Sequence, residues 1–220
     1  MTFKPVFIAL FLLSASTAFA QKAGGWSASA GFTQIAPDVS SGNLSAPSLP
    51  GTQVDINSNT QITGAVNYAM SDNIVINVPL GLGFKHKISG AGAIAGVGVI
   101  GTTKALPITL LGQYRFGEAN ATFRPFVGAG LSYIVFYKEK GTSVLTALTN
   151  PGGPATTLSF KDKLAPTIQI GVIYNVNERW YLEGNYAKTF LKTVGTLSTG
   201  QTISAKLDPN AYTFQVGYKF

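Results

Sequence analysis

The last ten residues constrain the fold more than any other part of this sequence. Large apolar side chains stand at every second position, and small or polar residues fill the places between them. Successive side chains of a strand point to opposite faces, whereas in a helix these apolar positions would circle the whole surface. The pattern therefore predicts a strand with one face toward lipid and one toward a narrow lumen. Its apolar positions are Tyr212, Phe214, Val216, Tyr218 and Phe220.

Seven further segments show similar alternation. They run from about Trp26 to Ile35, Asn59 to Met70, Ile74 to Ile88, Lys104 to Phe116, Phe123 to Tyr137, Phe160 to Tyr174 and Trp180 to Val194. In lipid, an unpaired backbone group costs several kcal/mol, so membrane-spanning strands must close into a barrel. The predicted fold is all-β: an eight-stranded antiparallel transmembrane β-barrel. The outward set of the third strand is expected to be Ile74, Ile76, Val78, Leu80, Leu82 and Phe84.

The connectors alternate between short and long. Residues 71–73, 117–122 and 175–179 are short, whereas residues 36–58, 89–103, 138–159 and 195–202 are longer. Outer-membrane barrels have short periplasmic turns and longer outer loops, so we expect both termini in the periplasm. Aromatic residues beside the short turns are expected to form a girdle at the membrane interface. They are Tyr68, Tyr114, Phe116, Phe123, Tyr174, Trp180, Tyr218 and Phe220.

The first twenty residues have the features of a cleaved export signal. Lys4 provides a positive start, Val6 to Leu13 form an apolar run, and Ala18-Phe19-Ala20 has the small-x-small pattern of a cleavage site. The run is too short to cross about 30 Å of hydrocarbon. We therefore expect residues 1–20 to be removed and residues 21–220 to form the barrel in a Gram-negative-type outer membrane.

Composition agrees with a protein that is partly solvated by lipid. Only 11% of the residues are charged, against roughly 25% in an average soluble domain. The chain has no cysteine, so disulfides do not hold it together. The formal charge of +7 comes from scattered lysines rather than a basic cluster, which argues against a nucleic-acid partner. Lysines near the outer rim are expected to meet anionic groups of outer-membrane lipid and lipopolysaccharide.

The inward positions predict a lumen of mixed character. An eight-stranded barrel leaves room for side chains or one small ligand, and a general ion pore would instead carry charged rings. The mixed lining favours a narrow passive channel for small hydrophobic or amphipathic molecules. The alternative is a filled structural barrel whose outer loops bind phage, toxin or host surfaces. The lining residues are predicted to be Asn67, Asn77, Pro79, Thr109, Leu111, Gln113, Phe126, Ile134, Phe136, Gln169 and Ala187.

Catalytic and metal chemistry find little support in the sequence. His86 is the only histidine, and neither metal-ligand spacing nor a serine elbow motif accompanies it. We interpret it as a polar residue near the outer end of the third strand. No catalytic residue, metal site or cofactor is therefore predicted.

Two prolines and one lysine interrupt the barrel pattern. Pro79 and Pro107 lie inside the third and fourth predicted strands, and each removes a hydrogen-bond donor from the ladder. The two positions suggest a weak seam through which an apolar solute could leave sideways into lipid. Lys188 falls at an outward position of the seventh strand. Either it lies high enough to snorkel, or a bulge shifts the register; we favour snorkelling.

Several segments together resemble the OmpW family. Each is short, but they follow the family's order and cover nearly all of the chain after residue 20. They are Thr60-Gln61, Asp72 to Ile74, Phe84 to Ile88, Leu106 to Leu111, Phe123 to Leu131, Leu158 to Asp162, Leu207 to Pro209 and Gly217 to Phe220.

This resemblance implies an eight-stranded outer-membrane barrel with an apolar lumen, associated with passive passage of small hydrophobic molecules. It also implies that the barrel-insertion machinery reads Phe220, together with Tyr218, as its signal. Pro79 and Ala187 depart from the pattern, because larger apolar residues would be expected at mid-barrel. A tight apolar constriction is therefore not expected at this level.

Overall fold

The computed structural model describes residues 23–220, so the predicted signal segment 1–20 lies outside the described residues. Strands dominate these residues. They are β1 (Trp26–Ala36), β2 (Ser40–Ser41), β3 (Thr52–Ile56), β4 (Asn59–Ala69), β5 (Ile74–Gly81), β6 (Phe84–Gly92), β7 (Val99–Arg115), β8 (Phe123–Gly141), β9 (Leu158–Phe160), β10 (Lys163–Asn175), β11 (Trp180–Thr189), β12 (Lys192–Leu197), β13 (Thr202–Lys206) and β14 (Asn210–Lys219), with one helix, α1 (Ser143–Thr149), between β8 and β9.

Eight strands close into a barrel, which confirms the predicted fold class. Each of these strands, with its continuation toward the loops, is called here a wall and is numbered in chain order. Around the barrel the order is β7, β5, β4, β1, β14, β11, β10 and β8, and β8 pairs with β7 to complete the ring. Every neighbouring pair is antiparallel, and the first and last walls meet with Ser27 opposite Lys219 and Ala36 opposite Asn210. Closure leaves no strand of the ring with an edge that is free along its whole length, as strands in lipid require.

Burial alternates along the barrel strands as the sequence pattern predicts. On β14, Phe214 and Val216 are exposed on the outside, whereas Gln215 and Gly217, which alternate with them, are buried. Exposed apolar residues of this kind recur on every wall, which gives the barrel an apolar outer surface. Such a surface fits a lipid environment, because a soluble protein would hide large apolar patches.

Aromatic side chains gather at the end of the barrel that carries the short turns, called here the turn end. Trp26 packs on Tyr68 with ring centroids 4.9 Å apart, and Trp180 packs on Tyr218 at 5.0 Å. Phe220 continues this row at 5.4 Å from Tyr218. Rows of exposed aromatics at one level mark the membrane interface in barrels of this type.

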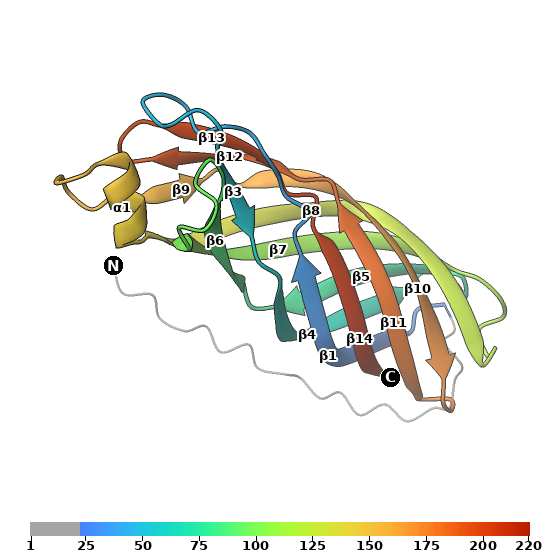
Figure 1. Ribbon diagram of the computed structural model, residues 1–220. Helices are drawn as coiled ribbons and strands as arrows, with labels where there is room; N and C mark the ends of the chain where they lie inside the picture. Colours follow the sequence, from blue (N-terminus) through green and yellow to red (C-terminus); the bar gives the residue numbers. More distant parts are fainter. Residues whose placement is uncertain (1–22) are drawn as a thin grey trace, which may run out of the picture.

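The opposite end, called here the loop end, is folded rather than loose. A separate four-stranded sheet forms there in the order β2, β13, β12 and β9, and α1 lies beside it (Figure 1). β7 and β8 also extend into this region, so the predicted loops 36–58, 89–103, 138–159 and 195–202 contain strands and a helix. No helix within residues 23–220 is long and apolar enough to span a membrane.

The third wall is broken, which corrects the single strand predicted from Ile74 to Ile88. β5 ends at Gly81 and β6 begins at Phe84. The break changes which face is inward, because Leu82 is exposed whereas Phe84 is 3% exposed and His86 is also buried. The predicted outward position of Phe84 is therefore wrong: alternation holds within a strand but not across two residues outside the ladder.

The sixth and seventh walls also differ from the predicted ranges. Leu158–Phe160 belongs to the loop-end sheet, and the sixth wall begins at Lys163. The seventh wall ends at Thr189, and β12 leaves the barrel to join the loop-end sheet. Lys188 stays in register opposite Asn210, and its ammonium lies 3.4 Å from the Asp38 carboxylate. This arrangement agrees with snorkelling at the rim and not with a bulge.

Candidate functional site

A cavity of about 130 Å³ occupies the middle of the barrel. Its wall is mostly apolar, with Leu111, Ile134 and Ala187 among the side chains that bound it. Cavities of this size, about 150 Å³, hold one benzene-sized molecule when their walls are apolar. The barrel is therefore not completely filled, and the space suits a small ligand.

Most of the predicted lumen residues meet at this cavity, and the others lie above or below it. Seven of the eleven line it: Asn77, Pro79, Thr109, Leu111, Ile134, Gln169 and Ala187. Asn67, Gln113 and Phe126 are buried closer to the turn end. Phe136 lies toward the loop end, where its ring packs 5.4 Å from that of Phe160.

A belt of hydroxyl groups surrounds the cavity. On one side Thr33 bonds both Thr63 at 2.7 Å and Thr213 at 3.0 Å. On the other side the chain of bonds joins four residues across four walls. It runs from Thr109 to Ser132 at 2.8 Å, on to Thr167 at 2.7 Å and to Thr189 at 2.9 Å. Because these hydroxyls satisfy one another, they give the wall polar atoms without creating open binding groups.

A polar plug closes the barrel between the cavity and the turn end. The Arg115 guanidinium donates to Gln113 Oε1 at 2.9 Å and to Asn67 Oδ1 at 3.4 Å. Gln113 in turn donates to Gln169 Oε1 at 2.8 Å, and Asn77 donates to Asn67 Oδ1 at 2.7 Å. These side chains are almost fully buried and bonded across several walls, so they hold the floor of the cavity rigidly.

Charged residues complete this plug, and the sequence analysis did not single them out. Arg124 donates to the Asp72 carbonyl at 2.6 Å, and Lys219 donates to Asn175 Oδ1 at 2.8 Å. Glu183 is 1% exposed and faces the same region from β11. One signal was available in the sequence, because side chains two or four positions apart on a strand face the same side. Arg124 precedes the predicted inward residue Phe126 by two positions, and Glu183 precedes the predicted inward residue Ala187 by four. Pairing inside the barrel was not readable from sequence.

One stretch of the barrel wall has no ladder of backbone pairs. β5 pairs with β7 only from Ile74 opposite Tyr114 to Asn77 opposite Leu111. Pairing resumes where Phe84 of β6 lies opposite Ala105. Between these points residues 78–83 face residues 106–110 unpaired, and we call this stretch the seam. Pro79 and Pro107 both lie in it; each pairs only on its far side, with Ala65 and Ile134 respectively.

The cavity reaches the outside of the barrel at the seam. Leu80 and Leu82 are 51% and 75% exposed on the lipid-facing surface, yet both also line the cavity. Leu106 borders it from the opposite side of the seam. A continuous ladder would separate the two surfaces, so the gap in pairing connects the apolar interior with the apolar exterior.

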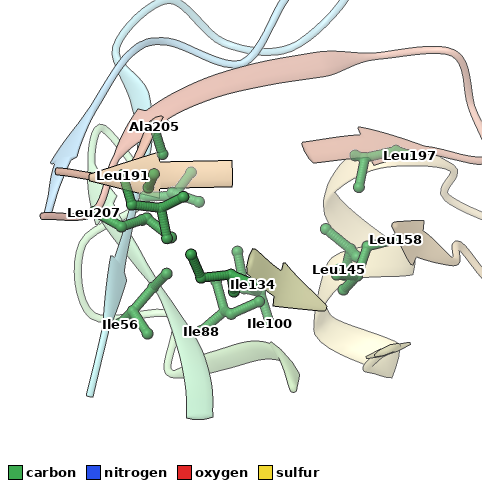
Figure 2. Close-up of a cluster of buried hydrophobic side chains, with 12 residues drawn as sticks. Ile56, Ile88, Ile100, Ile134, Leu145, Leu158, Leu191, Leu197, Ala205 and Leu207 are labelled. Carbon is green, nitrogen blue, oxygen red and sulfur yellow. The ribbon is translucent and has the colours of Figure 1, made fainter. Parts of the chain in front are cut away.

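Above the cavity, a cluster of buried apolar side chains fills the loop end. Ile56, Ile88 and Ile134 come from the barrel side and point toward Leu191 and Leu207 (Figure 2). A second group forms where α1 packs against the neighbouring strands. A smaller apolar cavity of about 70 Å³ lies within the cluster. The group beside α1 is Leu145, Leu158 and Leu197.

His86 lies between these two levels and has a structural environment. Its Nδ1 is 2.8 Å from the Asn57 carbonyl oxygen, at the corner between β3 and β4. Burial lowers the pKa of His86, and the bond to this carbonyl opposes the effect only in part. Residues 23–220 contain no group of three or more histidine, cysteine or acidic side chains able to hold a metal ion.

Comparison with known proteins places the barrel in a family. The model of the OmpW family matches residues 22–220, which is nearly the whole chain. The chain belongs to the OmpW family. It is 35% identical to outer membrane protein W of Vibrio cholerae over 96% of this chain and 95% of that protein.

Two further relatives extend this placement. The crystal structure of OprG from Pseudomonas aeruginosa superposes with a TM-score of 0.80 at 25% identity, covering 91% of this chain and 97% of that one. The dibenzothiophene metabolism operon protein PahQ of Pseudomonas aeruginosa is 26% identical over 89% of this chain and 88% of that protein. As an OmpW-family member, the chain is an outer-membrane β-barrel, and the resemblance drawn from its motifs is confirmed.

Proposed function

We propose that this OmpW-family barrel is a passive route for small hydrophobic or amphipathic molecules across the outer membrane. The loop end faces outward, and both termini lie in the periplasm. Solutes occupy the central cavity and leave sideways through the seam into the lipid. No energy source is needed, because an apolar solute moves down its own concentration gradient.

The observation that carries this proposal is the opening of the apolar cavity at the unpaired seam. Unpaired backbone in lipid costs several kcal/mol per group, so a gap in a barrel wall lowers stability. A gap that is kept despite this cost points to a function. Two prolines in the seam remove donors that would otherwise remain unsatisfied there. The gap is therefore built into the sequence rather than left by imperfect pairing.

The polar plug supports a sideways exit over a straight one. Arg115, Gln113 and Asn67 bond to each other directly below the cavity and are at most 2% exposed. An apolar solute would have to break these bonds to reach the turn end, and buried polar groups are costly to leave unsatisfied. For an apolar solute the seam offers a lower energy barrier than the plug, because the cavity wall and the lipid-facing surface beside the seam are both apolar.

The solute class is supported by the wall and by one relative. Pro79, Leu111 and Ile134 present carbon atoms to the cavity. PahQ is named for an operon of dibenzothiophene metabolism, and dibenzothiophene is an apolar aromatic compound. A relative whose name links it to the metabolism of an apolar compound supports a route for apolar molecules.

Two exposed parts of the barrel suit the partners expected at the membrane. Phe220 is 64% exposed and packs edge to face with Tyr218, so its ring is accessible for recognition by the barrel-insertion machinery. Lys85 and Lys87 are exposed on β6 just beyond the apolar surface. We expect them to lie among the phosphate groups of lipopolysaccharide.

The test is uptake of a small apolar solute into liposomes with and without the purified protein. The matched variant is Ala187→Trp, which adds a large ring to the cavity wall while leaving the seam untouched. We expect protein-dependent uptake that falls several-fold in Ala187→Trp. Folding of both proteins is checked by the heat-dependent shift in gel mobility.

The second candidate is a filled interaction barrel, and the apolar cluster at the loop end favours it. Twelve buried residues pack there above the cavity. A filled barrel would show uptake no faster than empty liposomes and no response to Ala187→Trp. That result, from folded protein, would replace the channel proposal with an interaction role for the loop end.

A further inference from the structure

Two buried acceptor atoms at the floor of the cavity have no hydrogen-bond partner within residues 23–220. They are Glu183 Oε2 and Asn77 Oδ1, on residues that are 1% and 2% exposed. Both residues line the cavity. Buried acceptors are nearly always satisfied in folded proteins, and an unsatisfied one costs free energy. Because both residues border the cavity, a molecule bound there is the nearest source of the missing partner.

The neighbouring bonds explain why these two atoms stay available. Asn77 donates its amide to Asn67 Oδ1 at 2.7 Å, which fixes the orientation of its own carbonyl oxygen. Glu183 accepts from Asn185 Nδ2 at 2.8 Å through Oε1, which leaves Oε2 free. Each side chain is thus held at one end and offers an acceptor at the other.

The charge of the surrounding plug selects the kind of donor. Three cationic side chains, Arg115, Arg124 and Lys219, are buried in the plug and interact with one another, whereas Glu183 is its only buried acidic side chain within residues 23–220, and Asp72 faces Arg124 from the exposed turn. The buried part of the plug therefore has a surplus of positive charge. A cationic ligand head would be repelled by this surplus. An anionic head would meet the two acceptors rather than donors. A neutral hydroxyl group avoids both conflicts.

We propose that the cavity floor is a binding site for a single hydroxyl group on a small apolar molecule. The hydroxyl donates to Glu183 Oε2, and the carbon body rests against Leu111, Ile134 and Ala187. The proposal rests on the proposed function and deepens it, because it names small alcohols and phenols as the preferred solutes. The cavity volume of about 130 Å³ limits the body to roughly the size of benzene.

The first experiment compares three probes of similar size on the full-length mature protein in lipid nanodiscs. Phenol carries a donor, anisole carries only an acceptor, and toluene carries neither. Binding is followed by the methyl shifts of Ala187 and Leu111 in NMR spectra. A hydrogen bond to a buried acceptor that is otherwise unsatisfied predicts that phenol binds roughly tenfold more tightly than anisole or toluene.

The second experiment replaces the acceptor. In Glu183→Gln the remaining oxygen still accepts from Asn185, while an amide NH₂ takes the place of Oε2 and cannot accept. We expect phenol affinity to fall to the level of anisole. Glu139→Gln is the matched control, because it makes the same change at a carboxyl group that bonds the Phe160 amide in the loop end, away from the cavity. It should retain the tenfold preference for phenol.

The outcomes separate this site from the proposed function. Equal binding of phenol, anisole and toluene would overturn the hydroxyl site and leave passage of apolar solutes intact. Binding of none of the three would overturn both. Tighter binding of protonated benzylamine than of phenol would overturn the assignment to a neutral hydroxyl group. The comparison of probes on the unaltered protein does not depend on the folding of any variant.

Discussion

At the level of single residues, the inward polar side chains of this barrel differ in whether they have a hydrogen-bond partner. Strand parity predicted which positions turn inward, and most of those positions are buried. Parity did not distinguish satisfied groups such as Ser132, bonded on both sides, from the open acceptor of Glu183. That distinction depends on which walls meet across the lumen, and period-two alternation carries no information about it.

Glycine substitutions test the packing of the turn end. A Cβ on Gly217 would lie 2.0 Å from the Tyr181 ring, whereas a Cβ on Gly184 would meet nothing within 4 Å. We expect Gly217→Ala to lower the free energy of unfolding by about 1–3 kcal/mol through overpacking. Gly184→Ala should leave it unchanged or raise it by roughly 0.5 kcal/mol. Denaturant unfolding in detergent micelles measures both, and equal effects would contradict the packing described for Tyr181.

The buried His86 predicts a dependence of stability on pH. Burial lowers its pKa in the folded protein below the ordinary value of 6.5, so the folded state holds the neutral ring. The stability contributed by this group is present above pH 6.5 and is lost as the pH falls below that value. We expect the free energy of unfolding to drop by on the order of 1 kcal/mol between pH 7.5 and 5.5. His86→Gln, which stays neutral, should lose this component; an unchanged pH profile would show that His86 is not the group responsible.

At the scale of elements, the walls were predictable and their interruptions were not. Hydrophobic alternation located all eight walls, because each must present carbon to lipid along its length. The break at Leu82-Gly83 coincides with a close contact between distant segments, because a Cβ on Gly83 would lie 2.3 Å from the Tyr137 hydroxyl oxygen. The departure of β12 into the loop-end sheet likewise depends on its pairing with β9, which is distant in sequence, as well as with the next strand, β13.

The prolines of the seam provide the test at this scale. Pro79→Ala with Pro107→Ala returns two donors to facing strands, which favours pairing of residues 78–83 with 106–110. We expect slower amide hydrogen exchange in these residues and slower uptake of an apolar solute. Faster or unchanged uptake in the double variant would contradict a role for the prolines in keeping the seam open.

At the level of the whole molecule, the barrel has three regions of different chemical character along its axis. The loop end is packed with apolar side chains, the middle holds the cavity and the seam, and the turn end is closed by a polar network. A solute that reaches the middle therefore meets apolar surface sideways and bonded polar groups below. The arrangement makes the seam the central element of the proposed route.

The most direct measurement is solute uptake by a barrel whose seam has been linked shut. The chain has no cysteine, so Leu80→Cys with Ile108→Cys introduces the only two thiols, on opposite sides of the seam. A short thiol cross-linker joins them, and Val127→Cys with Ile170→Cys, which face each other on paired strands away from the seam, is the matched control. If solutes leave through the seam, cross-linking abolishes uptake in the seam variant, reduction of a cleavable linker restores it, and the control is unaffected. Uptake that continues through the linked seam would contradict sideways exit.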